Sequence, residues 1–278
     1  MGTAIGVDVR DTIAGDALRA VLDAFFAVLV DVDRRFSPFR PDSEVSRISR
    51  GEIDEADASQ DLRWILGACE DLRRISGGTF DARGHRADGA LDPSGIVKGW
   101  AIEVAARALE AAGLRHYAIN AGGDVLAMGS PEPASAGPLP AGRDDTAGDR
   151  PGHGAATQGA PAWRVGIQHP LQDGAIAAVL LVTNRAVATS GQYERAAHIR
   201  DPRSGAVPDT LLSLTVVGPS LTWADAYATA AFPMGLDGLA WVHDRAGYGA
   251  LAITRDERVI WTPVIDPLLE RETPLPGA

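Results

Sequence analysis

The stretch LDPSGIVKGWAIEVAARALEAAGLRHYAINAGGDVLAMG, residues 91–129, predicts a helix followed by two strands that are joined by a Gly-Gly turn. Ser94 is expected to cap the helix, which would run to Ala112 and end at Gly113. On both sides of this segment, strand patterns come in consecutive groups with helices between the groups. That order predicts an α+β fold with a largely antiparallel sheet.

The flanking sequence supplies the other predicted elements. Six apolar residues between positions 18 and 29 recur at helical spacing and are expected on one buried face: Leu18, Val21, Leu22, Phe25, Phe26 and Leu29. Further helices are predicted within 36–49, at 59–78 with Gly77 and Gly78 as the stop, at 222–235 and at 236–245. Strands are predicted at 3–10, 79–83, 163–170, 174–191, 211–218 and, as a closing hairpin, 249–263.

Composition excludes several classes of protein. The chain has 278 residues, a net charge of -11 and no concentrated basic stripe, which argues against nucleic acid or an anionic membrane as the main partner. No run is long enough to span a membrane. The one cysteine, Cys69, excludes an internal disulfide and a multi-thiolate metal site, and its helical surroundings predict a small core residue. The first residues lack the pattern of a signal peptide, so we expect a cytoplasmic protein.

Residues 130–162 differ from the rest of the chain. They are rich in Pro, Gly, Ala and Asp and have almost nothing to bury, which predicts a disordered surface loop. The remainder is expected to form one domain over residues 1–278 that carries this loop as an insert.

Lys98 is the only lysine, because the other 25 of the 26 basic residues are arginines. Lysine is a compact point charge that can sit against a phosphate. Asp92, Gly95 and Lys98 are each three residues apart and lead into a helix N-terminus, which favours anions. The alternative is a solvated surface lysine placed there by chance.

Asp225 and Thr229 lie four residues apart on one predicted helix face. A carboxylate and a hydroxyl are hard oxygen ligands that suit Mg²⁺ together with phosphate oxygens. The alternative is structural: Thr222 and Asp225 resemble a capping box, and Thr229 could bond back to its own helix.

His198 comes just before an Asp-Pro turn, and a histidine in a loop can act as a general base near neutral pH. Ser190 lacks the G-x-S-x-G context of a hydrolase nucleophile.

Taken in order, nine segments resemble the family of FAD:protein FMN transferases, the ApbE-like flavin transferases. The resemblance covers most of the chain apart from residues 130–162 and the C-terminal tail. The segments are MGT, FSPFRPDSEVSRI, GGTFD, LDPSGIVKGWAIEVAARAL, INAGGDVLAMG, WRVGIQHP, ATSGQYER, HIRDPRSGAVP and LTVVGPSLTWADAYATAAFPMG.

This resemblance implies a T-fold-like α+β architecture and an enzyme that needs Mg²⁺. Such an enzyme transfers the FMN half of FAD to a serine or threonine hydroxyl of a target protein and releases AMP. The resemblance also implies residue roles. The flavin end would be lined by Met1, Phe39, Thr79, Phe80 and Asp81; FAD would be contacted by Asp92, Lys98, Ile199 and Ala228; the metal would be held by the Gly95 carbonyl, Asp225 and Thr229; and His198 would be the catalytic base.

The sequence departs from the family pattern at two places, and the first of them concerns the loop that covers the flavin. Only ARGHRADGA, residues 82–90, separates TFD from LDPSG, where the family usually has a longer segment, and Gln192 follows TSG where an acidic residue or Asn is common. Two other functions use the same residues: a hydrolase that splits FAD into FMN and AMP, and a flavin-binding module without chemistry.

Overall fold

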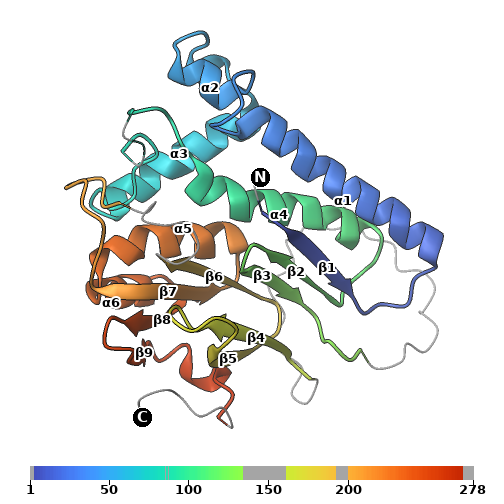
Figure 1. Cartoon of the computed structure of the whole chain (residues 1–278). Helices are drawn as coiled ribbons and strands as arrows, with labels where there is room; N and C mark the ends of the chain where they lie inside the picture. Colours follow the sequence, from blue (N-terminus) through green and yellow to red (C-terminus); the bar gives the residue numbers. More distant parts are fainter. Residues whose placement is uncertain (1–2, 85, 87, 134–160, 192–199, 272–278) are drawn as a thin grey trace.

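A seven-stranded, fully antiparallel sheet forms the middle layer of the protein, in the order β1-β2-β3-β6-β7-β8-β9 (Figure 1). The computed structural model describes residues 3–84, 86, 88–133, 161–191 and 200–271. The strands of this sheet are β1 (Ile5–Val9), β2 (Tyr117–Ala121), β3 (Asp124–Met128), β6 (Arg185–Gly191), β7 (Leu211–Gly218), β8 (Gly249–Thr254) and β9 (Val259–Trp261).

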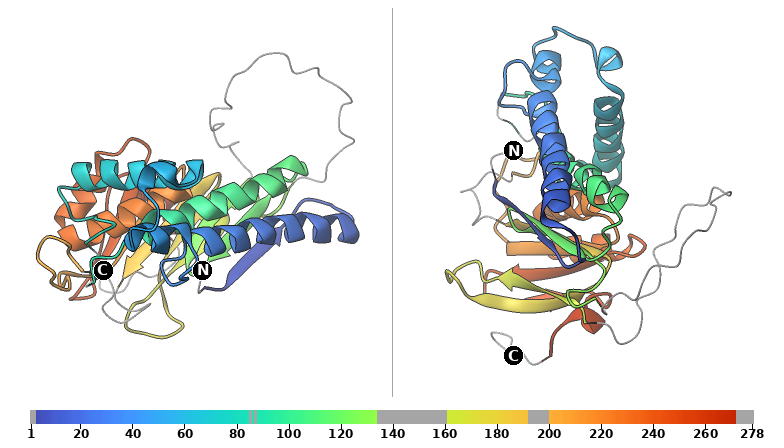
Figure 2. Two further views of the ribbon diagram at one scale, coloured as in Figure 1. Left: turned by 90° about the horizontal axis from the view of Figure 1, so that it is seen from above. Right: turned by 90° about the vertical axis from the view of Figure 1, so that its right-hand side faces the viewer.

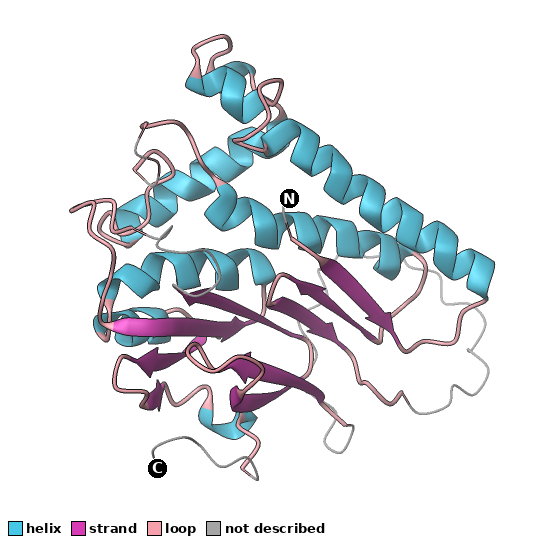
Figure 3. Ribbon diagram, viewed as in Figure 1, coloured by secondary structure: helices cyan, strands magenta, loops and turns pink. Residues whose placement is uncertain are grey.

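Helices cover one face of this sheet, and a separate two-stranded hairpin covers part of the other (Figure 3). The hairpin is formed by β4 (Trp163–Gln168) and β5 (Ile176–Val182), and it enters the chain between β3 and β6, which are neighbours in the large sheet. The helices are α1 (Gly15–Phe36), α2 (Glu44–Ser49), α3 (Gln60–Ile75), α4 (Ser94–Ala111), α5 (Leu221–Ala231) and α6 (Asp237–His243). The mixture of helices and antiparallel strands confirms the predicted α+β class.

Alternation along the strands produces two apolar cores, one on each face of the large sheet. Figure 2 shows the helices gathered on one side of this sheet. Side chains on one face of the sheet, such as Ile119 and Val216, pack against the helices. Their neighbours on the opposite face, such as Val217, pack against Val165 and Ile167 of the hairpin. The sheet is therefore buried on both faces where the hairpin lies beneath it.

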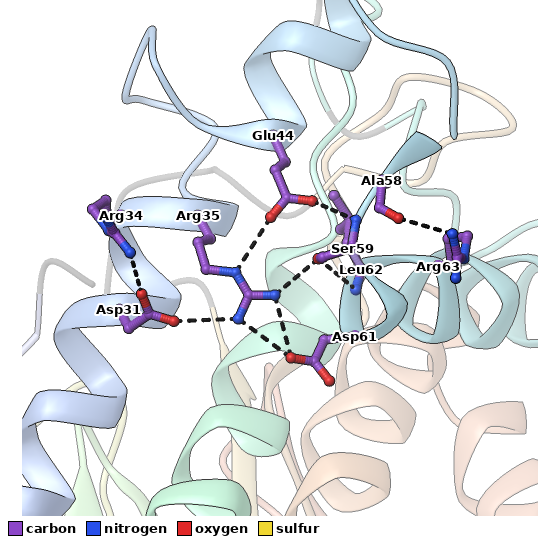
Figure 4. Close-up of polar contacts among 9 residues, drawn as sticks. All are labelled: Asp31, Arg34, Arg35, Glu44, Ala58, Ser59, Asp61, Leu62 and Arg63. Carbon is purple, nitrogen blue, oxygen red and sulfur yellow. Dashed lines mark hydrogen bonds and ion pairs between the residues drawn. The ribbon is translucent and has the colours of Figure 1, made fainter. Parts of the chain in front are cut away.

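Arg35, near the end of α1, ties the upper helices together (Figure 4). Its guanidinium donates to Ser59 Oγ at 2.8 Å, just before α3, and to Glu44 of α2 at 3.3 Å. It also bonds Asp31 and Asp61, at 3.2 Å each, and its side chain is only 24% exposed. A planar fork with several partners fixes the relative position of the three helices and of the loop between α1 and α2.

Three sequence-based details are wrong. Phe26 is 40% exposed, because one step of 100° along α1 turns it away from the buried Phe25. Residues 79–83 form turns rather than a strand. Ser94 is the first residue of α4, not its cap: Pro93 occupies the cap position, and Ser94 N–H donates to Asp92 Oδ1 at 3.1 Å.

Three further predictions have different outcomes. Cys69 is buried, as predicted. Most of the expected disordered loop, residues 134–160, lies outside the described residues. Within the part of the chain that the structure describes, no helix combines the length and apolar character needed to cross a bilayer.

Candidate active site

Two glycines bring α4 into close contact with α5 and the loop before α4. A Cβ atom on Gly99 would lie 2.4 Å from the carbonyl oxygen of Leu221, so only glycine allows this approach of the two backbones. One on Gly95 would lie 2.9 Å from Phe80 and 3.3 Å from the Thr229 methyl group. The predicted metal residues Gly95 and Thr229 are therefore side by side, although they are far apart in the sequence.

Lys98 lies between two buried carboxylates. Its Nζ atom is 2.6 Å from Asp124 Oδ2 and 3.3 Å from Asp225 Oδ1. The side chains of Asp124 and Asp225 are 2% and 6% exposed, whereas that of Lys98 is 31% exposed. This arrangement excludes the reading of Lys98 as a solvated surface residue: the single lysine is the shared partner of two buried acids.

Backbone groups hold the other oxygen of each acid. The N–H of Gly99 donates to Asp225 Oδ2 at 3.2 Å, and the N–H of Thr189 donates to Asp124 Oδ1 at 3.1 Å. Asp124 thus comes from β3, Asp225 from α5 and Lys98 from α4. Backbone N–H groups of α4 and β6 hold the two carboxylates in position.

The cluster of Lys98, Asp124 and Asp225 is electrostatically unbalanced, with one cation for two carboxylates. The pKa of Asp225 is raised to about 7, mainly by burial and also by the charge of Asp124, against the opposing effect of Lys98. Burial also raises the pKa of Asp124, against the opposing effect of Lys98. A second cation close to Asp225 would relieve this shortage of positive charge.

Asp225 does not act as a helix cap, so the capping alternative is wrong. The cap of α5 is Ser220, whose side chain accepts the N–H of Trp223. Thr222 is engaged elsewhere, because its hydroxyl bonds Glu103 of α4, which also accepts the N–H of Leu221 at 2.6 Å. Glu103 therefore accepts hydrogen bonds from the first residues of α5, and the Asp225 carboxylate can face Lys98.

The turn between β2 and β3 places the start of the chain near this cluster. Gly122 has a φ of +63°, and a Cβ there would lie 2.1 Å from Thr3 Oγ1. Thr3 therefore packs on the turn that leads directly into Asp124. Met1, which the resemblance places at the flavin end, lies outside the described residues, as do His198 and Ile199.

The remaining predicted ligand residues are of two kinds. Thr79, Phe80 and Ala228 are fully buried, and Thr79 Oγ1 donates to Ala230 O at 2.7 Å, so they support the wall between the α3–α4 loop and α5. In contrast, Phe39 is 78% exposed, with the Arg86 guanidinium 5.8 Å from its ring centre. Direct contact of these four residues with a ligand stays a prediction.

Two half-buried acids flank the α3–α4 loop. Asp81 Oδ1 accepts the N–H of Arg83 at 2.8 Å, and Asp92 Oδ1 accepts the N–H of Ser94 at 3.1 Å. Both carboxylates are thus held by local turns at the entrance to α4, and their contact with a ligand also stays a prediction.

The donor set fits a divalent cation that is shared with a phosphate ligand. Asp225 supplies a buried carboxylate, and one cation, the Lys98 ammonium, already lies 3.3 Å from it. Thr229 and the Gly95 backbone would add a hydroxyl and a carbonyl. No group of three or more His, Cys, Asp or Glu residues capable of holding a metal occurs among the described residues. Oxygen atoms of a ligand would have to complete the coordination shell.

Sequence reasoning missed Asp124 and Glu103. Asp124 follows the Gly-Gly turn and begins a buried strand, and an acid in that position is itself a signal of a buried partner. Glu103 gave no comparable signal, because an acid on a helix is usually solvated and only the packing of α4 on α5 reveals its role.

Comparison with known proteins identifies the family. The model of the ApbE family matches residues 1–87 and 83–252. An FAD:protein FMN transferase of Rhodobacter capsulatus is 31% identical over 189 residues, which are 65% of this chain and 31% of that protein. One from Salmonella typhimurium is 26% identical over 235 residues, which are 78% of this chain and 56% of that protein. The chain thus matches between about a third and somewhat more than half of the length of these two relatives.

Solved structures show the same fold. The flavin transferase ApbE from Vibrio cholerae superposes with a TM-score of 0.75 at 21% identity and covers 97% of this chain and 96% of its own. The ApbE protein from Thermotoga maritima gives 0.74 at 20% identity, with the same coverage. Because the family model matches nearly the whole described chain, the protein belongs to the ApbE family.

Proposed function

We propose that this chain transfers the FMN part of FAD to a serine or threonine hydroxyl of another protein, with Mg²⁺ as cofactor. The observation that carries the proposal is the position of Lys98 between Asp124 and Asp225, next to the contact of Gly95 with Thr229. A diphosphate bears negative charges and needs a local positive site in a protein of net charge -11. The names of the curated relatives support FAD as the donor and a protein as the acceptor.

Each residue of the site has a role in this reaction. Asp225, Thr229 and the Gly95 carbonyl would hold Mg²⁺, which when bound supplies positive charge to the diphosphate. Lys98 would add a second positive charge, and Asp124 keeps its ammonium in place at 2.6 Å. Positioning and charge stabilisation account for most of the catalysis of such a transfer.

The bond changes balance without any further reactant. The acceptor oxygen forms a bond to the phosphorus on the FMN side, the bond from that phosphorus to the bridging oxygen breaks, and AMP leaves with that oxygen. The proton of the hydroxyl passes to a base. By resemblance, we assign this base to His198, and a His198→Ala variant should bind FAD normally but transfer FMN about 10²–10⁴-fold more slowly.

The test measures two products of one incubation with FAD, Mg²⁺ and a candidate acceptor protein. AMP is quantified by chromatography, and the acceptor is weighed by mass spectrometry. The proposal predicts AMP release together with an acceptor that is heavier by one FMN less one water, because the hydroxyl oxygen becomes the phosphate ester oxygen. Asp225→Asn should slow both by at least about 10–100-fold, whereas Asp237→Asn, which changes an acid at the start of α6, should not. AMP with free FMN and an unchanged acceptor would indicate the hydrolase, and bound FAD without AMP would indicate a binding module.

A further inference from the structure

The carboxylate proposed to bind the metal already holds one cation. Lys98 Nζ lies 3.3 Å from Asp225 Oδ1, and the other oxygen of this carboxylate accepts the N–H of Gly99 at 3.2 Å. A divalent cation on Asp225 would therefore lie beside the ammonium, and two cations on one carboxylate repel each other. The lysine and the metal thus compete for Asp225 unless a second partner can hold the lysine.

Asp124 is such a partner. Its Oδ2 atom lies 2.6 Å from Lys98 Nζ, a shorter distance than the 3.3 Å to Asp225. The other oxygen of Asp124 accepts the N–H of Thr189 at 3.1 Å, and the side chain is only 2% exposed. Among the described residues, Lys98 is the only cation within ion-pair distance of either acid. Asp124 therefore holds the ammonium with a carboxylate that water cannot easily reach.

Of these three side chains, that of Lys98 is the one able to move. Both carboxylates are buried and are held by backbone N–H groups of the packed elements α4 and β6. Lys98 is 31% exposed, and a lysine carries its charge on a flexible four-carbon stem. Rotations about its side-chain bonds are enough to carry the ammonium away from Asp225 and fully onto Asp124.

The charges of the cluster favour this movement when a divalent cation binds. With both acids ionised, the cluster carries one positive and two negative charges, and a divalent cation reverses the sign of the sum. If the ammonium then left for the solvent, Asp124 would be a buried carboxylate without its cation, which is strongly unfavourable. If the ammonium stays on Asp124, the site keeps a net positive charge for a diphosphate.

We infer that Lys98 moves from its position between the two acids to Asp124 alone when a divalent cation binds Asp225. Asp124 is thus a positioning residue. It does not touch the metal, but it keeps the lysine inside the site and away from the carboxylate that the metal uses. The inference rests on the metal site of the proposed function and does not depend on the transfer of FMN.

The single lysine makes this movement observable. A protein labelled with ¹⁵N at the lysine side chain gives one ammonium signal in NMR spectra, and that signal belongs to Lys98. An ammonium held by buried carboxylates exchanges its protons with water slowly and is visible, whereas a solvated ammonium near neutral pH exchanges too fast. The probe is Mg²⁺ alone, without FAD, because water molecules can complete its coordination shell.

The unchanged protein and Asp225→Asn give the first comparison. In the unchanged protein, the Lys98 signal should shift with Mg²⁺ until it saturates, and it should stay visible because Asp124 still holds the ammonium. In Asp225→Asn, which lacks the proposed metal carboxylate, the same Mg²⁺ concentrations should leave the signal where it is.

Asp124→Asn gives the second comparison, because only one of the two acids is left to hold the ammonium. Mg²⁺ then has to displace Lys98 into the solvent, so we expect binding at least about tenfold weaker and loss of the Lys98 signal as Mg²⁺ saturates the site. The weaker binding alone would also follow from removing a nearby negative charge, but the loss of the signal would not. The matched control Asp237→Asn, at the start of α6, should behave as the unchanged protein.

Three results would overturn the inference: no response of the Lys98 signal to Mg²⁺ in the unchanged protein, an equal response in Asp225→Asn, or a signal of Asp124→Asn that persists with Mg²⁺ bound. The transfer assay is independent of these readouts. If Lys98 responds as expected but FMN reaches no acceptor, the proposed function fails and the inference stands. If FMN is transferred but Lys98 does not respond to Mg²⁺, the inference fails and the proposed function stands.

Discussion

Replacing Lys98 with methionine tests whether the single lysine neutralises the two buried acids. Methionine keeps the length and the apolar stem but removes the charge that lies 2.6 Å from Asp124 and 3.3 Å from Asp225. Removing one partner of a buried ion pair lowers the free energy of unfolding by about 3–5 kcal/mol. Lys98 is 31% exposed, so water can partly replace it, and we expect a loss near the lower limit, about 3 kcal/mol at pH 8.

The sign of the pH dependence makes this prediction specific. Both acids already have a raised pKa, and without Lys98 each pKa rises further. A carboxyl group whose pKa is higher in the folded state lowers the stability progressively as the pH rises from its unfolded-state pKa to its folded-state pKa, and costs little when both states are protonated. The deficit of Lys98→Met should therefore shrink between pH 8 and pH 5, and adding Asp124→Asn should recover part of it at pH 8.

Urea unfolding followed by tryptophan fluorescence measures these differences. A loss below about 1 kcal/mol that is equal at both pH values would refute the reasoning, because that is the range of an exposed ion pair. Lys98→Arg is a companion variant. Its broader guanidinium has to fit between Asp124 of β3 and Asp225 of α5, and we expect weaker FAD binding despite the retained charge.

Three further predictions concern stability and reactivity. Gly99→Ala should lower the free energy of unfolding by about 1–3 kcal/mol, because its Cβ would meet Leu221 O at 2.4 Å. Gly67→Ala on α3 has open space around it and should raise the free energy of unfolding by up to about 1 kcal/mol; urea unfolding measures both changes. In EDTA, Asp225→Asn should stabilise the protein above pH 7, by at most about 4 kcal/mol, since the pKa of Asp225 is about 7; equal stability of the two proteins at pH 8 would contradict this. Burial raises the pKa of Cys69 to about 12, so iodoacetamide at pH 8 should alkylate the folded protein about a thousandfold more slowly than the unfolded one.

Most of the fold could be predicted from the sequence because its signals are local. Helical spacing located α1 and α3, and the Gly-Gly turn located β2 and β3. The strand expected at 79–83 failed for a reason that lies elsewhere in the chain: Thr79 bonds the carbonyl of Ala230, 151 residues away, and this contact fixes the segment as a turn. The β-strand propensity of a short segment contains no information about so distant a hydrogen-bond partner.

The site could be predicted only in part. Lys98 stood out as the single lysine, and Asp225 with Thr229 stood out by their spacing. Neither signal could reveal that Lys98 is shared between two acids, because Asp124 reaches it through the pairing of β3 with its neighbours. The choice between a capping and a ligand role for Asp225 likewise depended on Glu103, which takes over the start of α5.

A crystal of the protein grown with FAD and Mn²⁺, examined by anomalous diffraction at the manganese edge, tests the central claim most directly. We expect a manganese peak in contact with the Asp225 carboxylate, Thr229 Oγ1 and the Gly95 carbonyl, with the FAD diphosphate beside Lys98. A peak at any other position, or FAD bound with its diphosphate away from Lys98, would contradict it.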